Sequence, residues 1–136
     1  ATDAAHKLMR IGFDAVAISD NHMQAIAASH LGENDAVIGI SHSGSSKDVV
    51  EAMKTARDKG AFTIAVTNYG KSPIDKYSDV KLFTSADETN YSILALNSRI
   101  AQLAIIDTLY FYIIYRMPEA KTAIEETERA LLNKKY

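Results

Sequence analysis

A serine- and glycine-rich segment, Ser41 to Asp48, separates two runs of apolar residues that differ in periodicity. Residues 36–40, before it, form a short continuous apolar run with the length and composition of a buried strand. Residues from about 46 to 59, after it, have the spacing of an amphipathic helix, and Gly60 is a typical stop signal. A strand that leads through a short turn into a helix is the repeating unit of parallel α/β sheets. The segment therefore predicts that the chain folds around such a sheet.

The side chains of this turn suit the binding of an anion. Serine hydroxyls donate hydrogen bonds, and the first turn of a helix adds free N–H groups and the positive end of the helix dipole. We therefore expect a phosphate site at Ser41, Ser43, Gly44, Ser45 and Ser46, where the glycine lets a ligand oxygen approach the backbone. The glycine–lysine–serine/threonine signature of nucleotide-binding loops is absent, which favours a monophosphate. The alternative is that these serines only cap the helix.

The pattern Ser41-x-Ser43-Gly44-x-Ser46 resembles the phosphate loop of the sugar isomerase (SIS) domain. In that family the loop holds the phosphate of a phosphosugar, usually with threonine where this chain has Ser46, and serine keeps the hydroxyl. Residues 98–107 look like the late helix of the SIS domains that form the C-terminal half of RpiR-family bacterial transcriptional regulators. Further landmarks that carry the resemblance are Thr67-Asn68, Ser72-Pro73 and Ser78-Asp79.

The resemblance covers nearly the whole chain and implies an α/β fold, a doubly wound parallel sheet in flavodoxin-like order with helices on both faces. A SIS domain opens with a strand and a small loop, whereas this chain begins inside what resembles the first helix. We therefore expect the first central strand to lie before Ala1, because a parallel sheet without a middle strand leaves backbone groups unpaired. Residues 1–136 are expected to form a single SIS domain with an amphipathic C-terminal helix over residues 119–136.

Periodicity and stop signals predict the remaining elements. A long helix over about residues 90–115, bounded by Pro118, is apolar on nearly every side from Leu103 to Tyr115, which predicts burial against the sheet and against a second subunit. The other expected helices are residues 3–12, a helix that Asp20 or Asn21 caps and Gly32 ends, a short turn at 74–78, and a tail helix at 119–135. The other expected strands are residues 15–18, 63–67 and 80–84, with a loop at 68–73.

Composition limits the kinds of partner. The chain has 136 residues, 47% of them hydrophobic, with a formal net charge of −2 and no cysteine. It therefore lacks the basic excess of a surface that follows a nucleic-acid backbone, and it has no thiolate metal ligand. We expect DNA to be bound only through a separate N-terminal helix-turn-helix domain outside this chain. A cytoplasmic location and no membrane contact are also expected, since the N-terminus has no apolar signal core. No metal and no cofactor are expected, and the four histidines show no paired spacing with carboxylates that would make a metal site.

Three further features are weaker candidates. Glu88 follows the last predicted strand and is expected to contact the phosphosugar. Some SIS isomerases place a catalytic acid or base there, and a glutamate also suits the first turn of a helix. His42 lies within the serine loop and faces either a ligand or solvent, and Thr67 ends a strand at the ligand-binding edge of such sheets. Arg99 and Asp107, on the long helix, are expected to form a buried or interfacial charge pair.

These features together predict the phosphosugar-sensing domain of a bacterial transcriptional regulator, at least dimeric, which binds its ligand without turnover. The alternative enzyme is an aldose–ketose sugar-phosphate isomerase that uses Glu88 and His42. A third alternative is a degenerate domain kept for dimerisation. Among sugars, hexosamine, N-acetylmuramic acid and pentose phosphates all stay open, as does whether the ligand induces or relieves DNA binding.

Overall fold

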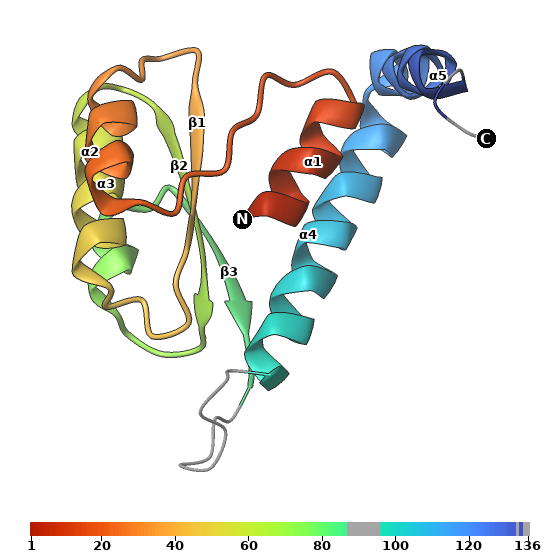
Figure 1. Ribbon diagram of the computed structural model, residues 1–136. Helices are drawn as coiled ribbons and strands as arrows, with labels where there is room; N and C mark the ends of the chain where they lie inside the picture. Colours follow the sequence, from red (N-terminus) through yellow and green to blue (C-terminus); the bar gives the residue numbers. More distant parts are fainter. Residues whose placement is uncertain (87–95, 133, 135–136) are drawn as a thin grey trace. The chain divides into compact units, whose positions relative to one another are not determined.

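The computed structural model describes residues 1–86, 96–132 and 134 (Figure 1). The chain divides into two compact units, one made of Ile18–Leu103 and the other of Ala1–Ala17 with Ala104–Tyr136. The larger unit contains the sheet, and the smaller one consists of helices.

Three parallel strands form the sheet of the larger unit. They are β1 (Ala36–Ile40), β2 (Phe62–Asn68) and β3 (Val80–Thr84), in the order β1-β2-β3. The register pairs Ile38 with Ile64 and Ile64 with Val80, so the carboxyl ends of all three strands lie at one edge. In Figure 1 the arrowheads of β2 and β3 point to this edge, at the lower side of the view. The expected parallel α/β architecture and these three strands are confirmed.

Helix α3 (Lys47–Asp58) covers one face of the sheet together with the short 3₁₀ helix η1 (Pro73–Tyr77), and α2 (Asn21–Ser29) packs on α3. Met53 of α3 is 1% exposed and packs with Ala65 and Ile74. A Cβ on Gly39 would lie 2.7 Å from the Met53 sulfur, so the methionine occupies the space that this glycine leaves. A second cluster joins α2 to α3 through Ala28, Ala56 and Ala61. These contacts hold the start of α3 beside the end of β1.

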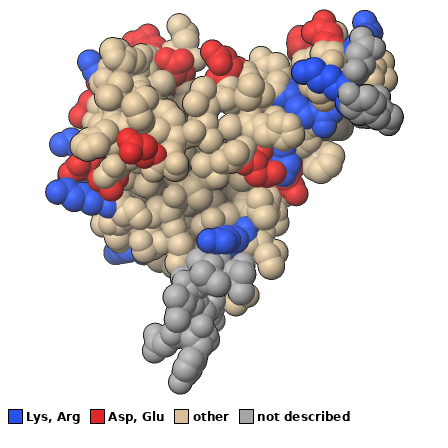
Figure 2. Space-filling model, in the orientation of Figure 1, with Lys and Arg blue, Asp and Glu red and all other residues tan. Residues whose placement is uncertain are grey.

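The outward face of α3 is charged, as its amphipathic sequence predicts. Lys47 forms an i,i+4 ion pair with Glu51 at 3.9 Å, and both side chains are largely exposed. Figure 2 shows acidic and basic side chains interspersed over the surface that α2 and α3 form on this side of the molecule. Exposed pairs of this kind contribute little to stability and mainly keep the surface solvated.

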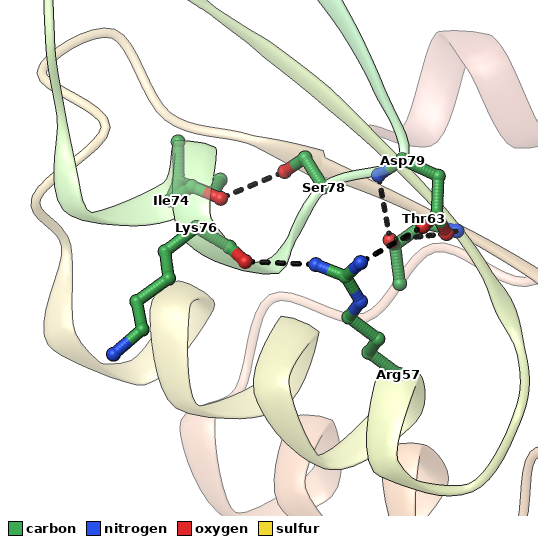
Figure 3. A network of polar contacts seen from close by, with 6 residues as sticks. All are labelled: Arg57, Thr63, Ile74, Lys76, Ser78 and Asp79. Carbon is green, nitrogen blue, oxygen red and sulfur yellow. Dashed lines mark hydrogen bonds and ion pairs between the residues drawn. The ribbon is translucent and has the colours of Figure 1, made fainter.

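A polar network fastens η1 and the start of β3 to the amino end of β2 (Figure 3). The Asp79 carboxylate accepts hydrogen bonds from the Thr63 N–H at 2.9 Å and from the Thr63 hydroxyl at 2.8 Å. Arg57 of α3 lies 3.4 Å from the same carboxylate and donates to the Lys76 carbonyl at 2.8 Å. The bonds from Thr63, backbone first, and then the charge of Arg57 lower the pKa of Asp79. This edge is opposite the one at which the strands end.

The smaller unit consists of α1 (Thr2–Arg10), the part of α4 (Leu96–Arg116) from Ala104 onward, and α5 (Pro118–Leu132). Lys7 of α1 donates to Asp3 at 2.6 Å and also to Asp107 of α4, and these bonds, that to Asp107 first, raise the pKa of Lys7. Asp107 therefore belongs to a charge pair, but its partner is Lys7 and not Arg99, which is exposed. Pro118 ends α4 as expected and begins α5, where its missing N–H costs nothing.

Residues 15–18 do not form the expected strand. Their β-branched residues favour an extended backbone, but a strand needs a neighbouring strand to pair its N–H and C=O groups, and none of the described strands pairs with this segment. Val16 is 76% exposed and contributes nothing to a core. The predicted helices agree with the described ones to within about three residues, while residues 90–95 of the expected long helix lie outside the described part of the chain. No single helix among the described residues has the length and hydropathy to cross a membrane.

Candidate functional site

The serine-rich loop, residues 41–46, connects β1 to α3 at the carboxyl edge of the sheet. The Ser41 N–H donates to the Val66 carbonyl at 3.0 Å and so extends the pairing of β1 with β2 by one residue. At the other end of the loop, Ser46 is the N-cap residue of α3 and its carbonyl accepts the first helical bond, from Val50 at 2.9 Å. The hydroxyls of Ser41 and Ser46 lie 3.0 Å apart, which closes the loop. Both ends of the loop are thereby fixed to regular structure.

Gly44 has a backbone conformation that the loop needs and that other residues rarely adopt. Its φ is +61°, and a Cβ at this position would lie 2.3 Å from the Ser72 hydroxyl oxygen and 2.8 Å from that of Thr67. The missing side chain therefore makes room for Ser72 and Thr67 of the protein itself. We expected the glycine to make room for a ligand, which stays a prediction; within the protein it makes room for Ser72 and for Thr67 of β2.

Three hydrogen bonds fasten the serine-rich loop to the last two residues of β2 and to η1. The His42 carbonyl accepts from the Asn68 N–H at 2.9 Å and from the Thr67 hydroxyl at 3.2 Å. The Gly44 carbonyl accepts from the Ile74 N–H at 3.0 Å. The backbone carbonyls of His42 and Gly44 are therefore bonded within the protein itself.

Ser72 supports this arrangement from the second loop. Its N–H and hydroxyl both donate to the Asp75 carboxylate, at 3.0 and 3.1 Å, in a capping box that begins η1. This capping box was not predicted, although the Ser-x-x-Asp spacing of Ser72 and Asp75 is its known signal. The capped turn holds the Ser72 side chain in the space that Gly44 leaves open.

The remaining serines are turned outward. Ser43 and Ser45 are exposed and bond each other locally, with the Ser45 N–H donating to the Ser43 hydroxyl oxygen at 3.2 Å. The Ser46 side chain makes no capping bond to α3. The first-turn N–H groups of the helix are therefore left for an outside acceptor, next to two exposed hydroxyls. An oxyanion placed there would meet these N–H groups on the favourable side of the helix dipole, although the Asp48 carboxylate also belongs to this first turn.

The remaining candidate residues are His42, Thr67 and Glu88. His42 is half-buried within the loop, whereas Thr67 is 0% exposed and uses its hydroxyl inside the protein. Glu88 lies outside the described residues. Among the described residues, no group of three or more His, Cys, Asp or Glu side chains is arranged to hold a metal ion.

Residues 1–112 match the family model of the SIS domain. The chain belongs to the SIS domain family. Curated relatives of this SIS domain include an uncharacterised HTH-type transcriptional regulator of Caldanaerobacter subterraneus, 43% identical over 113 residues, which are 83% of this chain and 40% of the relative. A second, from Clostridium perfringens, is 35% identical over 98% of this chain and 48% of its own length. The chain thus spans about half the length of the curated relatives that it matches, and these are named as regulators.

Solved structures include SIS domains of the same fold. A structure described as the Vibrio vulnificus NanR protein complexed with ManNAc-6P matches 98% of this chain and 51% of its own, with a TM-score of 0.91 and 28% identity. The sugar isomerase domain of an RpiR transcription factor from Sphaerobacter thermophilus matches with a TM-score of 0.77 over 94% of this chain and 70% of its own. At 23% identity, the second likeness bears on the fold alone.

Proposed function

We propose that this chain is the sugar-phosphate-sensing part of an RpiR-like bacterial transcriptional regulator. The observation that carries the proposal is the preorganised loop of residues 41–46, which gathers exposed serine hydroxyls and uncapped helix N–H groups on one side. The HTH-type regulators among the relatives and the ligand named for the NanR structure support it. The phosphate would be held by Ser43, Ser45, Ser46 and the first turn of α3, with Ser41, Gly44 and Thr67 holding the loop.

The proposal includes binding without turnover. An isomerase would use Glu88 and His42 for proton transfer. The proposal excludes turnover because Glu88 has no acid–base partner evident in the sequence. Recognition of DNA would belong to a separate helix-turn-helix domain in the remaining half of the regulator, which would act in the cytoplasm.

The proposal also includes a homodimer formed through α4. Phe111 and Tyr115 lie one turn apart on this helix and are 67% and 84% exposed, and Tyr112 beside them is exposed too. Large apolar patches on soluble proteins mark interaction surfaces. Association of two identical patches about a twofold axis is the commonest way to cover one.

Ligand-dependent thermal stabilisation tests the proposal. The panel contains N-acetylmannosamine 6-phosphate, glucosamine 6-phosphate, N-acetylmuramic acid 6-phosphate and ribose 5-phosphate, each beside its unphosphorylated parent sugar. A phosphorylated ligand at about 100 times its Kd should stabilise the protein by about 2.7 kcal/mol, while its parent should not. Equal stabilisation by the parent sugars would show that the loop only caps the helix.

Ser43→Ala adds a test at the level of one residue. A hydroxyl that donates to a charged phosphate oxygen contributes about 1.5–3 kcal/mol, so the variant should bind the best ligand roughly tenfold to a hundredfold more weakly. Ser29→Ala is the matched control, because Ser29 ends α2 and uses its hydroxyl only on the Ile26 carbonyl. Unchanged affinity in Ser43→Ala would remove the loop from the binding site.

A further inference from the structure

Asn68 connects the serine-rich loop to the end of β3. Its backbone N–H donates to the His42 carbonyl at 2.9 Å, on the side of β1. Its side-chain amide faces the other neighbour: Nδ2 donates to the Ala86 carbonyl at 3.2 Å, and Oδ1 accepts from the Ala86 N–H at 3.2 Å. The last backbone pair between β2 and β3 is Asn68 with Thr84. The Asn68 side-chain amide makes the same two kinds of hydrogen bond as a paired backbone residue, and it makes them with Ala86, two residues after Thr84.

Hydrogen bonds from the end of β2 and from Tyr69 fix the backbone on both sides of Ser85. On one side, Thr84 is held because its carbonyl accepts from the Tyr69 N–H at 2.8 Å and its hydroxyl donates to the Thr67 carbonyl at 3.3 Å. On the other side, Ala86 is held by the Asn68 amide. Thr84 and Ala86 are buried, whereas Ser85 between them is exposed. A hydroxyl is therefore presented outward from a rigid position at the carboxyl edge.

The position of Ser85 relative to the loop suits a ligand longer than a phosphate. Neighbouring strands are spaced by about 4.8 Å, so the end of β3 lies about two spacings from the end of β1. If the phosphate is held at the start of α3, the sugar ring can extend along the carboxyl edge of the sheet. It then passes the end of β2 and reaches the end of β3. Sugar hydroxyls need neutral donors and acceptors, which a serine hydroxyl supplies.

We propose that Ser85 binds a hydroxyl of the sugar and that Asn68 is the positioning residue that holds it in place. This inference rests on the proposed function, because it assigns the sugar end of the same site. The Asn68 amide bonds Ala86 through both its oxygen and its nitrogen, so its assigned role is to fix the backbone that carries Ser85. The pair would contribute to the choice among sugar phosphates and not to the holding of phosphate.

The test separates the two ends of the ligand. Calorimetric titration gives the Kd of the best sugar phosphate from the panel above and the Kd of inorganic phosphate for each variant of the intact protein. Ser85→Ala and Asn68→Ala should each weaken the sugar phosphate about 2- to 12-fold, the range that a neutral hydrogen bond contributes, with phosphate affinity unchanged. In the double variant with Ser85→Ala and Asn68→Ala, the loss of affinity for the sugar phosphate should not exceed the loss in Asn68→Ala alone by more than about twofold. The reason is that both changes remove the same contact.

A purely structural role for Asn68 would move other quantities. Thr63→Val is the control, since it removes a hydroxyl bond at the opposite edge of the same strand and should lower the melting temperature without changing either Kd. The inference is wrong if Ser85→Ala binds the sugar phosphate as the wild type does, or if Asn68→Ala weakens both ligands equally. Ser85 is exposed, so its variant decides the question even where Asn68→Ala is too unstable to titrate. Failure of the wild type to bind any of the sugar phosphates would instead refute the proposed function, and the inference with it.

Discussion

The hydroxyl oxygens of Ser41 and Ser46 lie 3.0 Å apart and share one hydrogen bond between the two ends of the loop. Ser41 is buried, whereas Ser46 is exposed at the start of α3. Each hydroxyl has one proton, so the bond uses one proton and leaves the other to donate elsewhere. The pair can therefore close the loop and still offer a donor to an anion.

Ser46→Ala should consequently have two effects. It should weaken sugar-phosphate binding at least severalfold, because a donor at the helix N-terminus is lost. It should also lower the free energy of unfolding without ligand by about 1–3 kcal/mol, because the buried Ser41 hydroxyl loses its partner. Urea denaturation and calorimetric titration measure the two effects separately. A variant that loses affinity at full stability would show that Ser41 finds another partner.

Gly44→Ala should be far more destabilising than Gly70→Ala. Both glycines have positive φ, +61° and +135°, so both substitutions strain the backbone by about 1–2 kcal/mol. A Cβ at Gly44 also meets Ser72 and Thr67, whereas nothing lies within 4 Å of one at Gly70. Overpacking should add about 1–3 kcal/mol at Gly44 alone, measured by urea denaturation. Adding Ser72→Gly to Gly44→Ala should recover part of the lost free energy of unfolding. Equal losses of this free energy in Gly44→Ala and Gly70→Ala would contradict the assigned role of Ser72.

Asp79 should make the stability of the protein depend on acid pH. Its pKa is lowered in the folded state by the bonds from Thr63, so the unfolded chain binds the proton first as the pH falls. The contribution is fully present above the unfolded pKa of about 3.9 and disappears as the pH falls through the lower folded value. The gap in urea midpoint between wild type and Asp79→Asn should therefore be widest near neutral pH and close in acid. A gap of the same size at pH 7 and at pH 2 would refute this role.

Tyr115→Glu should dissociate the proposed dimer. A carboxylate on the exposed apolar face of α4 would have to be buried without a partner when two copies associate, which raises the dimer Kd by at least tenfold. Analytical ultracentrifugation at micromolar concentration measures the change. Ile26→Glu, on the exposed side of α2, is the matched control and should leave the association unchanged. A wild type that sediments as a monomer would refute the dimer.

No sugar-phosphate isomerisation should accompany binding. Incubation with aldose and ketose phosphates, followed by separation of the two forms, should show no turnover approaching one per second, which lies at the low end of ordinary enzyme rates. Turnover that Glu88→Gln abolishes would favour the isomerase instead. Turnover unaffected by that substitution would indicate a contaminating enzyme.

Local sequence was enough to predict the strand, loop and helix at residues 36–59. The signals are short-range: a continuous apolar run, hydroxyl residues before a 3.6-residue period, and glycine after it. The same signals located the serine loop as the candidate site. They also predicted a strand at residues 15–18 that the structure lacks, because strand propensity resides in the residue whereas a strand requires a paired neighbour.

Tertiary structure decided the features that depend on residues far apart in the chain. Gly44 is required because Ser72, 28 positions later, packs against it, and Asp107 pairs with Lys7, 100 positions earlier, and not with Arg99 on its own helix. Asn68 had the sequence signal of a turn, yet its amide extends the sheet to Ala86. Sequence therefore determined the described helices and the three strands of the sheet, since these follow from neighbouring residues, but not the absence of a strand at residues 15–18. The partners of each polar side chain were decided only when the packed strands and loops brought distant residues within hydrogen-bonding distance.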